Sequence, residues 1–238
     1  MSDPGAGGTG PAARVVEASR ALAAAGQQDL VWGHVAVRDP DGRGAWMKAS
    51  GWGLDEVDAA RVLLVGWEGE RVAGEGQPHI ESHIHLSVLR ARPDVSASVH
   101  THPEVVNAFS ALDVPLQALS HDGVPFVHPQ LPRSPLSGDL VADRARGDRL
   151  AAALASAPAC LMPRHGLLAV GGDEAEAVMH AVLLTSACRV MLLAAAAGRV
   201  RSSSDAEEVA AKREHVWPRR QLDAGYRYLA RQRSAPSR

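Results

Sequence analysis

The sequence predicts one large domain of mixed α/β class. Residues 30–50 and 61–74 each place two strand-like runs around a turn, the pattern of a β-hairpin. Other segments have apolar residues at helical spacing, so the order of elements is neither all-β nor a strict β-α-β repeat. With 238 residues, of which 46% are hydrophobic and 22% charged, the chain can bury a sizeable core.

The elements up to residue 112 follow from local spacing and from residues that start or stop helices. A run that begins at Pro11 and ends at Gly26 keeps its apolar residues on one face, as a helix does. Glu81 to Ala91 has similar spacing, and Pro93 ends it. The expected order is a helix at 11–26, strands at 30–39 and 45–50, a helical turn opened by Asp55, a hairpin at 61–74, a helix at 81–91, a strand at 95–102 and a helix from Pro103.

The elements after residue 112 end in a polar tail. The expected order is a Pro-rich ordered loop with short strands at 113–137, a helix at 139–157, two strands at 159–173, a long apolar helix from Asp173 to about Gly198, and a helical tail at 202–238 that carries Tyr226 and Tyr228. We expect residues 11–200 to form the domain and residues 201–238 to extend it. Residues 1–10 contain a literal G-x-G-x-x-G, but no strand precedes it, so they are expected to be a flexible tail.

The charge balance indicates a small partner. Lys plus Arg number 25 against 27 Asp plus Glu, a net charge of -2, so no global field indicates nucleic acid or an anionic membrane. A small molecule or another copy of the chain is expected instead. Cys160 and Cys188 lie in apolar segments, as buried thiols of a reducing compartment do, so we expect the cytoplasm. The most apolar window contains Arg189 and is interpreted as a buried helix, and the amino terminus lacks a signal-peptide pattern.

A metal site is predicted by the spacing of histidines. The chain has 11 of them, and His100 and His102 stand two apart on a predicted strand, so both point to one face. A metal held by protein usually needs a third ligand, and His165 fits because Gly166 lets the chain bend there. Glu81 is the acid we expect nearby, since it begins the helix that leads into the histidine strand. A single strand-end histidine is more often structural, and it is the same-face pair that favours a metal.

Two other histidines on the same predicted helix have a simpler interpretation. His83 and His85 are expected on the helix surface, or buried and hydrogen-bonded, and are not assigned to the metal.

Several motifs in order resemble the class II aldolase/adducin amino-terminal domain family over roughly residues 12–200. They are a Glu before a helix, then RPD at 92–94, HTHP at 100–103, and later HG at 165–166. The resemblance implies a three-layer α/β/α fold with a central, mostly antiparallel sheet. It also implies a divalent ion on His100, His102 and His165, Glu81 as fourth ligand or acid/base, and a homotetramer with active sites at subunit interfaces.

The residues expected to bind the substrate differ from those of the sugar-phosphate aldolases that this family contains. Their G-N-x-S stretch corresponds here to Gly33-His34-Val35-Ala36, and His79-Ile80 precede Glu81 in place of two serines. Ser50-Gly51 is retained. Where those aldolases have a proton-donating tyrosine from a neighbouring subunit, this chain has His121-Asp122. Phosphate recognition and retro-aldol chemistry are therefore not favoured.

The stretch from His34 to Arg38 instead resembles the decarboxylase branch of the family. Loss of CO2 leaves a carbanion, which a metal chelated by an adjacent substrate oxygen can stabilise as an enolate. We therefore expect a decarboxylase of a non-phosphorylated hydroxy or oxo acid. The residues expected to line its substrate pocket are His34, Ser50, Gly51, His79, His121 and Asp122. Arg38 is a further candidate for the leaving carboxylate, if its side chain reaches the cavity.

Three alternatives stay open at this point. The first is an aldolase that cleaves a β-hydroxy carbonyl compound through the same enolate, the second a non-haem iron oxygenase, and the third a metal-free scaffold like the adducins. Zinc is the expected ion, with manganese, iron and cobalt as alternatives. Tyr226 and Tyr228 are expected to pack in the tail or to reach a neighbour's site.

Overall fold

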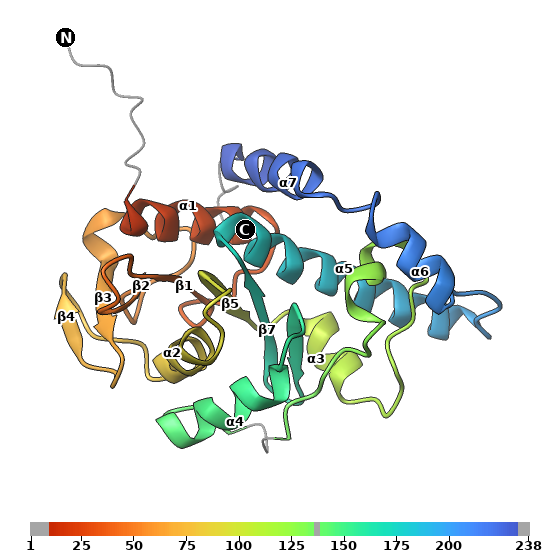
Figure 1. The fold of residues 1–238 in the computed structure, drawn as a ribbon, viewed down its shortest axis with the longest axis horizontal. Coiled ribbons are helices and arrows are strands. Elements are labelled where there is room, and N and C mark those ends of the chain that lie inside the picture. Colours follow the sequence, from red (N-terminus) through yellow and green to blue (C-terminus); the bar gives the residue numbers. More distant parts are fainter. Residues whose placement is uncertain (1–9, 136–138, 233–238) are drawn as a thin grey trace, which may run out of the picture.

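Seven strands form one antiparallel sheet at the centre of the molecule (Figure 1). The computed structural model describes residues 10–135 and 139–232. The strands are β1 His34–Arg38, β2 Gly44–Lys48, β3 Val62–Gly66, β4 Arg71–Ala73, β5 Ala97–Thr101, β6 Ala159–Met162 and β7 Gly166–Gly171. Their order is β4-β3-β2-β1-β5-β7-β6, and each pairing between these strands is antiparallel. The adjacency of β1, β5 and β7 matters below because these strands lie at the site.

Helices cover both faces of the sheet. They are α1 Pro11–Ala24, α2 Ser82–Ala91, α3 Glu104–Ser110, α4 Arg144–Leu154, α5 Glu174–Ala197, α6 Ala206–Arg213 and α7 Arg219–Arg231, with 3₁₀ helices η1 at Ala59–Arg61 and η2 at His121–Phe126. In Figure 1, α1, α5 and α7 lie above the sheet and α2 and α4 below it. The predicted three-layer α/β/α architecture with an antiparallel sheet is therefore confirmed.

Alternation along the central strands divides the core in two. On β1, Val35 and Val37 pack with α1 and α5, whereas Ala36 packs on the other side with α2 and α4. This is the period of two expected for a sheet covered on both faces. The side chains of His34, Ser98 and His100 fall on the same face as Ala36, because they share its parity in the β1–β5 pairing. The histidine face of the sheet is thus the face that α2 covers.

The long helix α5 is the one helix of the described residues that is apolar and long enough to cross a membrane by length and composition. In its most apolar window 61% of the residues are buried inside the molecule, as in the core helix of a soluble protein. Asp173 begins it as an N-cap whose side chain accepts a hydrogen bond from the Glu176 backbone N–H. The predicted start of this helix at Asp173 agrees with the structure.

Two predicted elements were wrong in extent. The strand expected at 30–39 begins only at His34, because Leu30 adopts a left-handed φ of 47° and Trp32 N–H donates to the Asp29 carbonyl in a turn. The helix expected at 139–157 is α4, which starts after its N-cap Asp143.

The loop at 113–137 was expected to contain short strands, and this was also wrong. Its described part contains η2 and two isolated bridges, Ala118 with Ser204 and Arg133 with Leu161. Its prolines remove backbone donors that a strand ladder needs. The expected flexible tail lies, except for Gly10, outside the described residues.

Candidate metal centre

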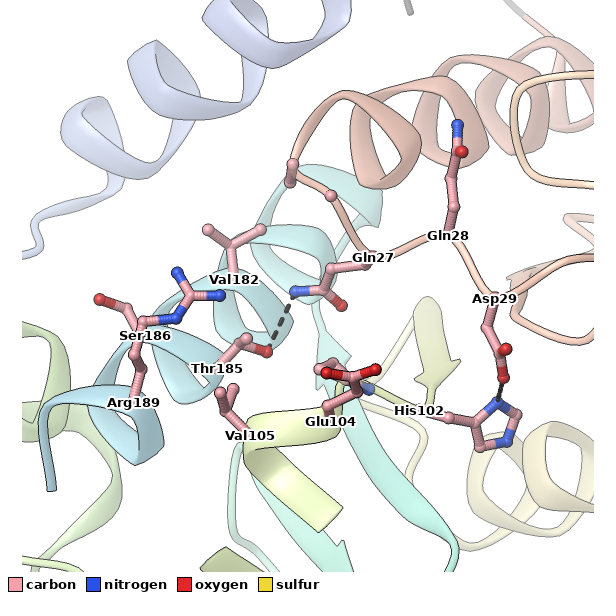
Figure 2. A pocket seen from close by; sticks show the side chains of 13 residues that line it. Gln27, Gln28, Asp29, His102, Glu104, Val105, Val182, Thr185, Ser186 and Arg189 are labelled. Atoms are coloured by element: carbon pink, nitrogen blue, oxygen red, sulfur yellow. Dashed lines mark hydrogen bonds and ion pairs between the residues drawn. The ribbon is translucent and has the colours of Figure 1, made fainter. Parts of the chain in front are cut away.

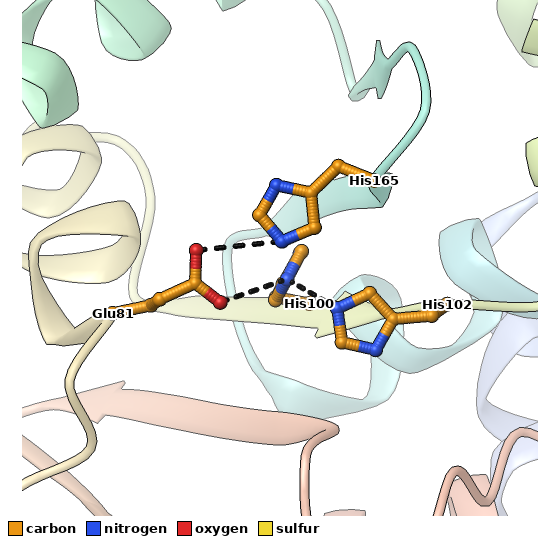
Figure 3. Close-up of side chains that lie close together, drawn as sticks. All are labelled: Glu81, His100, His102 and His165. Atoms are coloured by element: carbon orange, nitrogen blue, oxygen red, sulfur yellow. Dashed lines mark hydrogen bonds and ion pairs between the residues drawn. The ribbon is translucent and has the colours of Figure 1, made fainter. Parts of the chain in front are cut away.

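Four side chains converge at the end of β5 (Figure 3). They are Glu81, His100, His102 and His165, and one potential ligand atom from each lies within 4.8 Å of all the others. His100 is on β5, and His102 follows the strand end. Glu81 is the residue that precedes α2, and His165 lies in the turn between β6 and β7. The structure thus brings together the four residues that the sequence grouped.

A glycine lets the His165 turn approach β5. A Cβ built on Gly166 would lie 2.4 Å from the Thr101 carbonyl oxygen and 2.9 Å from the His102 ring. Both distances are far below van der Waals contact, so no larger residue fits without a shift of the backbone. Arg164 beside it adopts a left-handed φ of 64°, which completes the sharp bend predicted here.

The hydrogen bonds of two rings fix which nitrogen can bind an ion. His100 Nδ1 donates to the Leu167 carbonyl at 2.8 Å, and His102 Nδ1 donates to the Asp29 carboxylate at 2.9 Å. Since each Nδ1 carries the hydrogen, each neutral ring has a lone pair on Nε2. These two Nε2 atoms lie only 2.9 Å apart. Two facing lone pairs repel, and a cation between them and the carboxylate removes that repulsion, so the donor set fits a divalent metal.

The carboxylate of Glu81 is buried but ionised by its neighbours. Its Oε1 accepts the Val141 backbone N–H at 2.9 Å and lies 3.3 Å from His165 Nε2, while Oε2 lies 3.9 Å from His100 Nε2. Burial raises the pKa of Glu81, but the contact with His165 and the Val141 hydrogen bond lower it by more, so the pKa lies below its ordinary value. Burial lowers the pKa of His100 well below its usual range, and the neighbouring rings add to this. Neutral imidazoles and an ionised carboxylate are the forms that bind metals.

A second group of histidines adjoins the first. His34 is fully buried and lies directly opposite His100 in the β1–β5 pairing, with ring centroids 5.1 Å apart. The His79 ring lies 4.1 Å from that of His34, and burial lowers the pKa of His79 to about 4. His85, on α2, is buried and bonded to His34, which agrees with one of the two interpretations given for it above. Of the six predicted pocket residues, His34 contacts the ring of a cluster residue, His100, and His79 is linked to the cluster through its contact with His34.

The other four predicted pocket residues have no described contact with the four-residue cluster. Ser50 and Gly51 form an exposed turn, and Ser50 N–H donates to the Gln77 carbonyl, two residues before His79. Asp122 accepts a hydrogen bond from Ser186 on α5, and the His121 carbonyl accepts one from the Trp217 indole. Among the described residues no hydrogen bond or ion pair joins His121 or Asp122 to the four-residue cluster.

Arg38 does not reach the cluster. Its guanidinium donates to the backbone carbonyls of Leu89, Arg92 and Val95, at the end of α2 and in the turn that follows. These bonds hold that turn against β1. These bonds direct the guanidinium toward the α2 turn, so no described contact of Arg38 meets the condition that its side chain reach the site.

A cavity of about 540 Å³ opens beside His102 (Figure 2). The loop after α1, the start of α3 and one side of α5 line it, and Asp29 and His102 are both at its wall. Sequence reasoning missed Asp29, because Gln27-Gln28-Asp29 lies in an irregular loop with no periodicity. A contact between a carboxylate and the metal-binding imidazole that it orients is visible in the folded structure, whereas the spacing of residues in the sequence gives no sign of it.

Comparison with known proteins identifies the family. Residues 13–192 match the family described as Class II Aldolase and Adducin N-terminal domain. The chain is 34% identical to a 3,4-dihydroxyphthalate decarboxylase of Terrabacter sp. (strain DBF63), over 83% of this chain and 86% of the relative. It is also 34% identical to Decarboxylase NovR of Streptomyces niveus, over 72% of this chain and 64% of that protein.

The solved structures agree with this. The L-fuculose 1-phosphate aldolase from Glaciozyma antarctica PI12 is 27% identical, with a TM-score of 0.81 over 92% of this chain and 86% of that one. Decarboxylases and aldolases are both lyases, and the metal-binding cluster is present. The chain therefore belongs to the class II aldolase/adducin family, where it is similar to the decarboxylase-like branch, and is a lyase.

Proposed function

We propose that the chain is a metal-dependent decarboxylase of a non-phosphorylated hydroxy or oxo carboxylic acid, with hydroxylated aromatic acids as the substrate class to test first. The observation that carries the proposal is the pair of Nε2 lone pairs of His100 and His102, which face each other at 2.9 Å beside Glu81. The 34% identity with a 3,4-dihydroxyphthalate decarboxylase supports the substrate class.

The residues of the cluster have separable roles in this proposal. His100, His102 and His165 hold the ion, for which zinc is the first candidate and manganese, iron and cobalt the others. A divalent ion supplies Lewis acidity, which stabilises negative charge as it develops on a nearby oxygen. Glu81, whose Oε1 is held by the Val141 N–H, binds the ion as a fourth ligand or moves a proton at its Oε2.

The substrate pocket is proposed on both sides of the metal residues. His34 contacts His100 and His79 contacts His34 inside the chain, and the exposed turn of Ser50 and Gly51 borders the segment before His79. His121 and Asp122 take part in this proposal through a second copy of the chain, in a homotetramer with sites at subunit interfaces. The cytoplasm remains the proposed compartment, in keeping with the two free, buried cysteines.

Product analysis tests the proposal. Protein reconstituted with zinc, manganese, iron or cobalt is incubated separately with 3,4-dihydroxyphthalate, with related hydroxylated benzoates and with a 4-hydroxy-2-oxo acid. Retro-aldol cleavage would split the last of these into an aldehyde and a 2-oxo acid. CO2 and aldehydes are both measured. CO2 without aldehyde is expected. His102→Asn should abolish turnover and metal binding, whereas His215→Asn, at an exposed histidine, should leave both unchanged.

An aldehyde product would refute decarboxylation. It would support retro-aldol cleavage, the second candidate, which the likeness to an L-fuculose 1-phosphate aldolase favours. The same cluster would serve both reactions, because each needs a stabilised carbanion.

A further inference from the structure

Three buried side chains form a hydrogen-bonded row beside the metal residues. Ser98 Oγ lies 2.7 Å from His85 Nδ1, and His85 Nε2 lies 2.6 Å from His34 Nδ1. All three residues are completely buried. The row joins β5 to α2 and then to β1, and it ends one strand away from His100.

Counting donors and acceptors fixes the direction of this row. If His85 donated from Nδ1, the Ser98 hydroxyl hydrogen would have no acceptor among the described residues, and His34 Nε2 would be a lone pair without a donor. In the opposite direction Ser98 Oγ–H donates to His85 Nδ1, and His85 Nε2–H donates to His34 Nδ1. Only one group, the N–H at His34 Nε2, then lacks a partner. Buried polar groups are almost always paired, so the direction with fewer unpaired groups holds.

The open end of the row adjoins a second unpaired nitrogen. His34 Nε2 and His79 Nδ1 are both buried without a hydrogen-bond partner among the described residues, and their rings lie 4.1 Å apart. No described hydrogen bond holds the His79 ring, which keeps 6% of its surface exposed. A ligand atom that reached His34 Nε2 would therefore break no described hydrogen bond of the His79 ring. An unpaired N–H at His34 Nε2 beside a cation site suits an anionic oxygen as its acceptor.

We propose that His34 Nε2–H and His79 form a subsite for a carboxylate or enolate oxygen of the metal-bound substrate, and that His85 and Ser98 are positioning residues that fix the donor tautomer of His34. This inference rests on the proposed function for its substrate. The tautomer of His34 is a property of the protein alone and is tested without turnover. His85 and Ser98 touch no substrate and act through His34.

The test compares two buried serines. Ser98→Ala removes the donor that sets the direction of the row. Ser87→Ala is the matched control, because Ser87 lies on α2 near His85 and its buried hydroxyl has no described partner. Both variants are loaded with zinc, the imidazole tautomers are determined by nitrogen-15 NMR, and the dissociation constant of salicylate, a hydroxylated aromatic carboxylate, is measured.

The expected result is that His34 carries its hydrogen on Nε2 in the wild type and in Ser87→Ala. In Ser98→Ala the two directions leave the same number of groups unpaired, so we expect a mixture of the two His34 tautomers and salicylate binding about twofold weaker. Ser98→Thr, which restores a hydroxyl, should recover the Nε2–H signal. A wild-type His34 with its hydrogen on Nδ1 would overturn the proposal, as would equal salicylate affinity in Ser98→Ala and Ser87→Ala.

Failure of the subsite can be told apart from failure of the proposed function. A zinc-loaded wild type that does not bind salicylate would overturn the carboxylate subsite. Salicylate binding without CO2 release from any hydroxylated benzoate would leave the subsite in place and refute the decarboxylase instead.

Discussion

Replacement of Asp29 by asparagine is the most direct test of how the metal residues are oriented. The Asp29 carboxylate accepts the hydrogen from His102 Nδ1 at 2.9 Å and so keeps the lone pair of that ring on Nε2. Asparagine has nearly the same size but no charge, and one end of its amide is a donor. If that end faces His102, the ring must carry its hydrogen on Nε2, where it cannot bind an ion.

The structure limits the size of the effect. Partners that orient metal-binding histidines contribute about 10- to 100-fold to metal affinity, which corresponds to about 1.4 to 2.7 kcal/mol. The Asp29 side chain is 34% exposed, so solvent screens part of its charge. We therefore expect Asp29→Asn to weaken zinc binding about 10-fold, near the lower end of that range, with the fold unchanged.

Zinc affinity is measured by competition with a chromogenic chelator. Asp113→Asn is the control, because it removes the same charge from an exposed loop residue. Equal zinc affinity in Asp29→Asn and Asp113→Asn would refute the reasoning, since the carboxylate would then not orient His102. Circular dichroism of the metal-free proteins shows whether both variants are folded.

Three more predictions concern stability and reactivity. Burial lowers the pKa of Lys48 to about 8, so the unfolded chain binds more protons than the folded chain between pH 8 and about 10.5. From pH 7 to 10 the unfolding free energy of the wild type should therefore rise by about 2 to 3 kcal/mol relative to that of Lys48→Met. Urea unfolding measures this, and the same change with pH in both proteins would contradict it. Gly166→Ala should cost at least about 2 kcal/mol and weaken zinc binding, while Gly10→Ala, with open space around it, should do neither in thermal and zinc titrations. Burial raises the pKa of Cys160 and of Cys188 to about 12, so Ellman's reagent should react with neither thiol at pH 8 until urea unfolds the protein.

The metal residues could be grouped from the sequence because their geometry is local. A strand has a period of two, so His100 and His102 share a face wherever the strand lies, and a glycine after His165 indicates a bend. Glu81 was assigned to the site because it begins the predicted helix that leads into the histidine strand. The order of strands in the sheet has no such local signal, and the antiparallel three-layer fold was expected only from the resemblance to a family.

The residues that support the metal site could not be found in the same way. Asp29 meets His102 across 73 residues, and His85 meets His34 across 51. Both contacts depend on where β1 lies relative to β5 and α2, which no periodicity encodes. The same limit explains why Arg38 was considered for the site. Its acceptors lie in the turn after α2, and the sequence gives no sign of those contacts.

The two ends of the proposed site differ in what holds them. The metal end is built on regular structure: His100 is on the central strand β5, bonded through Nδ1 to β7, and Glu81 is fixed by the Val141 N–H. Side chains held by strands and by hydrogen bonds keep their geometry before any ligand arrives. The residues proposed for the substrate end lie mostly on turns, such as Ser50 and Gly51, or on η2. A chain can change such loops without moving the metal residues, which is a physical reason why one fold serves both decarboxylases and aldolases.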